Sequence, residues 1–348
     1  MKAVSVIKRA VTAYEGWADV RWRRPPNLTV LPSSGKPVVY YLSPSEQRPS
    51  GGVKVIYQHV DVLNSMGVSA AVLHQPDGFR CTWFENQTKV VSAREIRFHA
   101  DDILVVPECY GAGLHYLPAQ IRTVIFNQGP HHTFDRIDVA GSGATSPYAK
   151  LENLIGFLTV SDDGAELLRY AFPSTPVAVA RNVIDPAVFR PRTGPAAHRI
   201  GYIPSRRPEE VHQLRHIVRA QERSGLAGWD LVEISGRTEA QVADIMRSCG
   251  VFLSLSDRDG FGLPPAEAMA SGCYVVGYPG GGGREFFDPE YCSPVEDFTG
   301  LVRGLLAAAS MDGPVLDGLG LKASARILGR YTEDGLRADL MAFYGGLS

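Results

Sequence analysis

Short apolar runs rich in β-branched and aromatic residues alternate with helix-length amphipathic segments along most of this chain. The first unit has an apolar run at 37–42, a segment with helical spacing at 53–66 that ends at Gly67, and a second apolar run at 68–73. Strands joined by such a crossover pair in parallel, because a hairpin connection would be much shorter. The alternation therefore predicts an α/β fold built on parallel sheets.

The alternation occurs in two series, separated by a proline-containing stretch at 177–191. A chain of 348 residues exceeds what one hydrophobic core usually serves, so two domains are expected. The predicted boundaries are an extension at 1–36, a first domain at 37–191 and a second domain at 192–332. Further strands are predicted at 103–106, 123–126, 157–160, 199–203, 230–234, 251–255 and 274–277, and further helices at 209–223, 239–248, 265–271, 296–309 and 333–344.

Charge and hydropathy exclude two classes of protein. The formal net charge of −2 lacks the strong positive field of a dedicated nucleic-acid binder, so no nucleic-acid partner is expected. No apolar run reaches the roughly 18 residues of a membrane-spanning helix, so we expect a cytoplasmic protein. Residues 1–24 are basic, with Trp17 and Trp22 interleaved. They predict either peripheral contact with a membrane or partner, or a solvated extension packed on its own domain.

The stretch at 254–272 carries the strongest functional signal. An apolar run ends at Leu255, a glycine-rich loop follows, and a helix has Pro265 in its first turn and Gly272 at its end. Such a loop presents unpaired N–H groups and the positive end of a helix dipole at the carboxyl end of a parallel strand. The expected guest is a diphosphate, and a carboxylate one turn into the helix, Glu267, is either a ligand contact or a structural cap.

Asp259, seven intervening residues and Glu267, within the pattern G-F-G-L-P-P-x-E-A-M-A-x-G, resemble the retaining family-4 glycosyltransferases of the GT-B fold, the glycosyl transferases of group 1. The resemblance implies that Asp259 contacts the hydroxyls of the donor sugar and that Glu267 holds the nucleotide ribose. It also implies that the sugar and diphosphate face the backbone amides of Gly260, Phe261, Gly262 and Leu263. The family usually has Glu at position 259, so either the reach toward the sugar is altered or Asp257 shares the role.

Four other segments resemble the family in the same order along the chain. They are 160–164, 182–185 with Val183 in place of the usual glycine, 280–285, and 330–331 before the final helix. The resemblance implies two facing Rossmann-like domains with a nucleotide-sugar cleft between them, and a C-terminal helix at 333–348 that returns to the first domain.

Positive charge has to neutralise the leaving diphosphate, and neither a suitable D-x-D nor a His/Asp/Glu cluster predicts a metal or cofactor site. Arginine binds phosphate oxygens in a bidentate manner, so Arg206 or Arg207 is predicted in this role, with Arg237 as a weaker candidate. The alternative is that these are solvated surface arginines. The family also has a lysine five positions after its arginine, where this chain has Val211.

In the first domain, the loop at 50–54 contains Gly51 and Gly52, which permit close approach of the backbone. The resemblance implies that this loop faces the donor and the acceptor; the alternative is a plain turn and helix start. The resemblance also implies a histidine after the strand at 123–126 that faces the reacting sugar. The candidates there are Gln128, His131 and His132, with Glu108 after an earlier strand as a further one.

These features predict a hexosyltransferase that moves a sugar from a nucleotide-diphosphate donor to a saccharide, lipid-linked or small-molecule acceptor. The resemblance implies retention of configuration and independence of metal. Two alternatives stay open: a sugar-nucleotide epimerase or phosphorylase of the same fold, and a non-catalytic sugar-nucleotide-binding protein. The second is favoured by Asp259, Val183 and the missing lysine.

Overall fold

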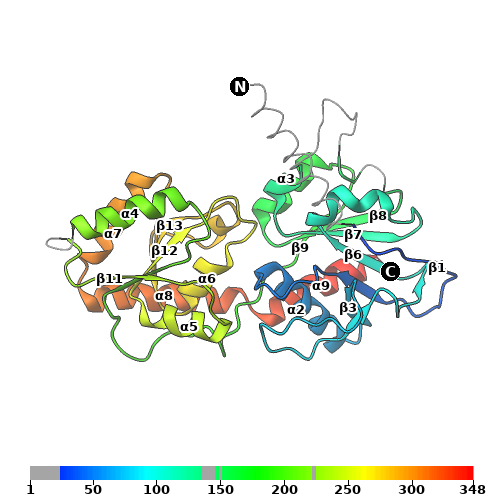
Figure 1. Ribbon diagram of the computed structural model, residues 1–348, viewed down its shortest axis with the longest axis horizontal. Coiled ribbons are helices and arrows are strands. Elements are labelled where there is room, and N and C mark those ends of the chain that lie inside the picture. Colours follow the sequence, from blue (N-terminus) through cyan, green and yellow to red (C-terminus); the bar gives the residue numbers. More distant parts are fainter. Residues whose placement is uncertain (1–23, 135–145, 149–150, 222–224, 348) are drawn as a thin grey trace, which may run out of the picture.

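The computed structural model describes residues 24–134, 146–148, 151–221 and 225–347. Within these residues the chain forms two large parallel sheets with helices packed around each, and the two units lie side by side (Figure 1). We refer to them as the first and second domain. Residues 1–23, which carry most of the predicted membrane or partner contact, lie outside the described residues. No described helix has the length and apolar character needed to cross a membrane.

The first domain is organised around a seven-stranded sheet in the order β4-β3-β2-β6-β7-β8-β9. Its strands are paired in parallel and their apolar side chains are buried, as expected for a sheet covered on both faces. The strands are β2 (Val39–Leu42), β3 (Ala70–His74), β4 (Val90–Ser92), β6 (Ile103–Pro107), β7 (Arg122–Asn127), β8 (Leu154–Thr159) and β9 (Val177–Val179).

Two α-helices follow the strands of the first domain that matter most for the site. Helix α2 (Gly51–Ser65) follows β2, and α3 (Asp162–Ala171) follows β8. Shorter 3-10 helices follow β6 and β7, and a small parallel pair lies at the edge of the domain. These elements are η1 (Glu108–Tyr116), η2 (Pro130–His132), β1 (Val30–Leu31) and β5 (Phe98–His99).

The second domain has a five-stranded parallel sheet in the order β11-β10-β12-β13-β14. Ligands of such sheets bind at the carboxyl ends of the strands where the order reverses, here beside β10 and β12. The strands are β10 (Arg199–Tyr202), β11 (Asp230–Glu233), β12 (Val251–Leu255), β13 (Tyr274–Tyr278) and β14 (Ser293–Pro294). The helices are α4 (Pro208–Ala220), α5 (Glu239–Ser248), α6 (Leu263–Ala270), α7 (Phe298–Ala309) and α8 (Gly313–Arg330), with η3 (Gly282–Glu285) after β13.

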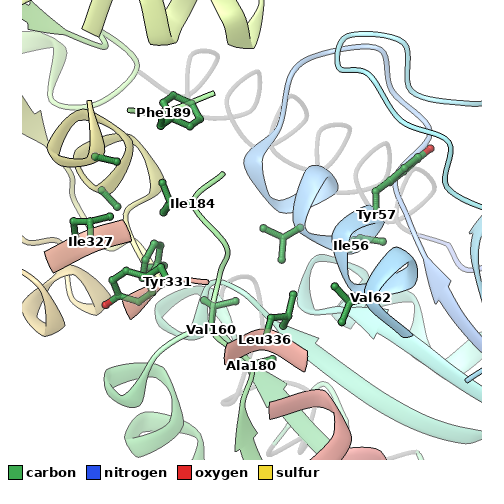
Figure 2. Close-up of a cluster of buried hydrophobic side chains, with 14 of the residues drawn as sticks. Ile56, Tyr57, Val62, Val160, Ala180, Ile184, Phe189, Ile327, Tyr331 and Leu336 are labelled. Atoms are coloured by element: carbon green, nitrogen blue, oxygen red, sulfur yellow. The ribbon is translucent and has the colours of Figure 1, made fainter. Parts of the chain in front are cut away.

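The chain returns to the first domain after α8. Helix α9 (Glu333–Gly345) packs against α2, and the hydroxyl of Tyr344 lies 2.9 Å from that of Tyr41 on β2. An ion pair of 2.7 Å joins Arg181 to Asp339 of α9. The core is continuous across the crossing: Figure 2 shows Ile184 and Tyr331 between the side chains of the two domains. This packing fixes one domain against the other.

The predicted and observed elements differ in several places. Helix α8 was not predicted, and β9 forms within a stretch that was interpreted only as connecting chain. Helix α6 begins at Leu263, two residues before the predicted start, because Gly262 already has a left-handed backbone with φ of +93°. The predicted elements at 239–248 and 251–255 have the observed limits of α5 and β12.

Candidate functional site

A cavity of about 880 Å³ lies between the two domains. It is lined by loops that follow the carboxyl ends of strands from both sheets, including those after β2 and β7 in the first domain and after β10, β11 and β12 in the second. The predicted site residues that line it are Gly51, Gly52, Gln128, Arg206, Arg237, Asp259, Gly260, Phe261, Gly262, Leu263 and Glu267. Arg207 and His131 are not among its lining residues.

Two helices begin at the cavity from opposite domains. The side chain of Ser50, at the start of α2, makes no capping hydrogen bond. The residue at the start of α6, Gly262, has no side chain that could make one. The two helix starts approach closely: a Cβ added at Gly51 would lie 2.6 Å from Cδ1 of Leu263. Both helices therefore direct backbone N–H groups and the positive ends of their dipoles toward one space, an arrangement that favours an anion.

The glycine loop before α6 touches the first domain. A Cβ at Gly260 would lie 1.9 Å from the carbonyl oxygen of Gln128, so no residue other than glycine fits there without a shift of the loop. The Phe261 side chain is buried against Phe286 and Tyr331, with ring centroids 5.2 and 4.8 Å away. Phe261 thus anchors the loop by its ring.

Arg206 and Asp259, which both line the cavity, form an ion pair. Nη2 of Arg206 lies 2.9 Å from Oδ1 of Asp259. The arginine follows β10 and the aspartate follows β12, the two strands that flank the reversal of strand order. In this ion pair the positive charge of Arg206 and the negative charge of Asp259 neutralise each other. Both side chains line the cavity in which a charged donor would lie.

Arg207 points away from this arrangement. Its backbone is left-handed, with φ of 46°, and its guanidinium lies 3.9 Å from the centroid of the Tyr278 ring. The side chain pairs with Glu210 at 2.9 Å and with Asp257 at 3.4 Å. Of the two predicted arginines, only Arg206 is therefore positioned toward the cavity, and the structure gives Asp257 no place beside Asp259 in it.

Glu267 lies one turn into α6 and borders the cavity. Burial raises the pKa of its carboxyl to about 7, the ammonium of Lys54 acts in the opposite direction, and Glu239 adds to the rise. No described residue donates a hydrogen bond to its carboxylate. Arg237, after β11, lines the same cavity.

Gln128 connects the loop after β7 to α2. Its Nε2 donates a 3.0 Å hydrogen bond to the carbonyl of Gly52, and its backbone N–H donates to the carboxylate of Glu108 at 3.1 Å. Burial raises the pKa of Glu108, although hydrogen bonds from the backbone oppose the rise. The carboxylate of Glu108 thus holds the loop after β7 in place. His131, in contrast, pairs with Asp163 at 3.2 Å and lies near Gly281.

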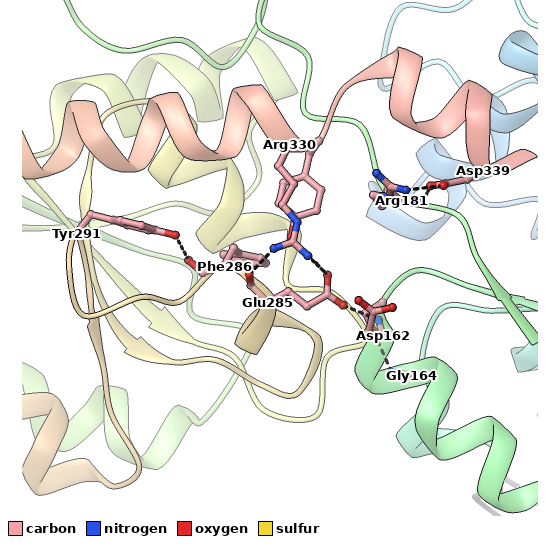
Figure 3. Close-up of polar contacts among 10 residues, drawn as sticks. Asp162, Gly164, Arg181, Glu285, Phe286, Tyr291, Arg330 and Asp339 are labelled. Carbon is pink, nitrogen blue, oxygen red and sulfur yellow. Dashed lines mark hydrogen bonds and ion pairs between the residues drawn. The ribbon is translucent and has the colours of Figure 1, made fainter.

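The segment at 280–285 links the domains beside the cavity (Figure 3). The carboxylate of Glu285 accepts a hydrogen bond from the backbone N–H of Asp162, at the start of α3 in the first domain. It also pairs with Arg330 at 3.4 Å. Arg284 adds an ion pair of 3.1 Å to Asp163. These contacts hold the loop after β13 against the first domain.

The chain is similar to glycosyltransferases in sequence and in fold. Residues 221–306 match the model of the family "Glycosyl transferases group 1". This match lies within the second domain. A relative from Actinobacillus pleuropneumoniae, described as an alpha-1,6-glucosyltransferase, is 26% identical over 242 residues, which is 66% of this chain and 69% of the relative.

Solved structures show the GT-B fold for the chain as a whole. A sucrose-phosphate synthase from Thermosynechococcus elongatus has a TM-score of 0.63 at 13% identity, over 89% of this chain and 99% of that one. The Anabaena protein HepE, solved with UDP and glucose, has a TM-score of 0.62 at 13% identity, over the same 89% of this chain and 99% of its own. The predicted fold class, two facing Rossmann-like domains, is confirmed.

Two cationic residues of the cavity were not predicted from the sequence. Lys54 pairs with Glu239, and Arg48 lines the cavity from the loop after β2. Lys54 lies within the glycine-containing segment at 50–54, so its position beside Gly51 and Gly52 was the available signal. Among the described residues, no group of three or more His, Cys, Asp or Glu side chains is arranged to hold a metal ion.

Proposed function

We propose that this chain transfers a sugar from a nucleotide-diphosphate donor to an acceptor bound at the first domain, with retention of configuration and without a metal ion. The observation that carries the proposal is the meeting of two uncapped helix starts, α2 and α6, at a cavity that also holds Arg206, Asp259 and Glu267. The match of 221–306 to the group 1 model and the GT-B fold support the class of reaction.

The donor diphosphate would lie between the two helix starts. The backbone N–H groups of 260–263 and the guanidinium of Arg206 supply donors on the side of the second domain, and the start of α2 supplies them on the other. Glu267 would accept hydrogen bonds from the ribose. Asp259, released from Arg206 as the arginine turns to phosphate, would accept them from the donor sugar.

The chemical step would use electrostatic stabilisation of the leaving group. As the bond between the anomeric carbon and the diphosphate breaks, negative charge grows on the phosphate oxygens, where Arg206 and the two helix starts are already oriented. The acceptor oxygen bonds to the same face of the sugar, and its proton passes to the oxygen of the leaving diphosphate. Gln128, held by Glu108 and Gly52, would position the sugar from the first domain.

Arg206→Ala tests the assignment, with its neighbour Arg207→Ala as the matched control. Loss of one well-oriented donor to developing charge costs on the order of 10²–10³ in rate, so Arg206→Ala should lower turnover by that factor. Arg207→Ala should retain most of the turnover, because its side chain contacts Tyr278, Glu210 and Asp257. Sugar transfer is measured by chromatography of products from a panel of nucleotide sugars and acceptors. Equal rates in the two variants would contradict the role of Arg206.

The same product analysis distinguishes the other possible activities. A transferase releases nucleoside diphosphate and forms a glycosylated acceptor, whereas an epimerase converts the donor when no acceptor is added. Tight donor binding with neither product would indicate a non-catalytic protein and would contradict the proposal. We propose a cytoplasmic location for this reaction, where nucleotide sugars are present.

A further inference from the structure

An ion pair crosses between the domains at the cavity. Lys54 lies one turn into α2 of the first domain, and Glu239 is the first residue of α5 in the second. Nζ of Lys54 donates to Oε1 of Glu239, and the two side chains are 18% and 23% exposed. Both residues line the cavity, as does Glu267. The pair therefore joins the two domains at the side of the cavity where Glu267 lies.

Helix α5 does not need Glu239 as a cap. Thr238 and Gln241 form a complete capping box, in which each side chain accepts a hydrogen bond from the backbone of the other residue. The carboxylate of Glu239 is therefore free to orient Lys54. Nζ of Lys54 also lies 6.0 Å from the centroid of the Phe189 ring, which limits where its ammonium can go.

The carboxylates of Asp259 and Glu239 accept hydrogen bonds from Arg206 and Lys54. No described residue donates a hydrogen bond to the carboxylate of Glu267. The charged groups that act on it are Lys54 of α2 and Glu239 of α5. The strands beneath α6, β12 and β13, carry no charged residue, and α8 contacts α6 through the hydroxyl of Ser324, which donates to the carbonyl of Ala270. The charged groups that influence the ionisation of Glu267 are thus Lys54 and Glu239, the two residues of the ion pair between the domains.

We propose that Lys54, oriented by Glu239, is a positioning residue that holds a positive charge beside Glu267 and so couples nucleotide binding to contact between the two domains. The inference rests on the proposed function, in which Glu267 accepts hydrogen bonds from the ribose as a carboxylate. In this arrangement the first domain supplies a cation beside a nucleotide-binding residue of the second domain. With the domains in contact, Lys54 offsets part of the effect of burial on the Glu267 carboxyl.

The pH dependence of donor binding separates this role from simple bridging of the domains. Wild-type affinity should fall as the pH is lowered through about 7, the pKa of Glu267. Lys54→Met should move the midpoint of that fall to higher pH, because it removes the group that lowers this pKa. Glu239→Gln should move the midpoint to lower pH, because it removes a group that raises it.

The experiment measures affinity by calorimetry from pH 5.5 to 8.5 with UDP-glucose, GDP-mannose and ADP-glucose as probes. The diphosphate of a nucleotide sugar lacks the terminal phosphate ionisation near pH 6, so the protein alone titrates in this range. Opposite shifts of the midpoint in the two variants are the expected result. A uniform loss of affinity at every pH, with an unmoved midpoint, would show that the pair only bridges the domains and would overturn the inference. Failure of the wild type to bind any probe would instead contradict the proposed function itself.

Discussion

Glu267→Gln should have opposite effects on stability and on donor binding. Burial raises the pKa of Glu267 from 4.5 to about 7 in the folded protein. Between these values the folded state binds a proton that the unfolded chain has lost, so the contribution of this group to stability declines as pH rises through that window. Above about pH 7 the folded protein carries a costly buried charge.

The size of the effect follows from the linkage between protonation and folding. A shift from 4.5 to about 7 corresponds to on the order of 3 kcal/mol, taken as an upper limit. Glutamine keeps the shape of the side chain without the charge. The free energy of unfolding of Glu267→Gln should therefore exceed that of the wild type by up to about 3 kcal/mol at pH 8, and the difference should vanish below pH 4.5.

Donor binding should change in the other direction. A hydrogen bond to a charged group contributes about 1.5–3 kcal/mol, so loss of the carboxylate should weaken nucleotide-sugar binding by roughly tenfold to a hundredfold at pH 8. Urea unfolding at pH 8 and pH 4.5 measures the stability difference, and calorimetry measures the affinity. If Glu267→Gln is less stable than the wild type at pH 8, the buried carboxylate of Glu267 does not lower the free energy of unfolding, and the interpretation is refuted.

Two further predictions concern the loop at the domain boundary and the core of the first domain. Gly260→Ala should lower turnover on the order of 10²-fold, because its Cβ would collide with the carbonyl of Gln128 and displace the loop. The control is Gly329→Ala, whose Cβ would meet no atom within 4 Å. Equal turnover in the two variants would contradict the prediction. Burial lowers the pKa of His59 to about 3, so the wild type should lose stability relative to His59→Phe as pH falls from 6.5 toward 4, in urea unfolding. A difference that is independent of pH would refute that account.

Much of the fold was predictable because local pattern and tertiary packing agree. Most strands of both sheets are short apolar runs with buried side chains, and such runs are readily recognised in a sequence. Helix α8 was missed because its glycines lower helix propensity. Its helical state depends on tertiary contacts instead: Gly320 approaches the carbonyl of Gly272, and Ala323 and Ile327 are buried.

The site was predictable where its residues are close in sequence and less so where they meet through the fold. Asp259 and Glu267 belong to one loop and one helix, so a single motif, resembling that of a known family, indicated both residues. Lys54 and Glu239 are 185 residues apart, and only the packing of the two domains brings them together. The left-handed backbone of Arg207, which turns it from the cavity, also depends on contacts that adjacent arginines in a sequence do not reveal.

The crystal structure of the protein with its best-binding nucleotide sugar tests the central claim most directly. The account predicts the diphosphate at the start of α6, within hydrogen-bond distance of the N–H of Leu263, with Arg206 turned from Asp259 to a phosphate oxygen. A donor bound elsewhere, with the 2.9 Å contact between Arg206 and Asp259 intact, would contradict it.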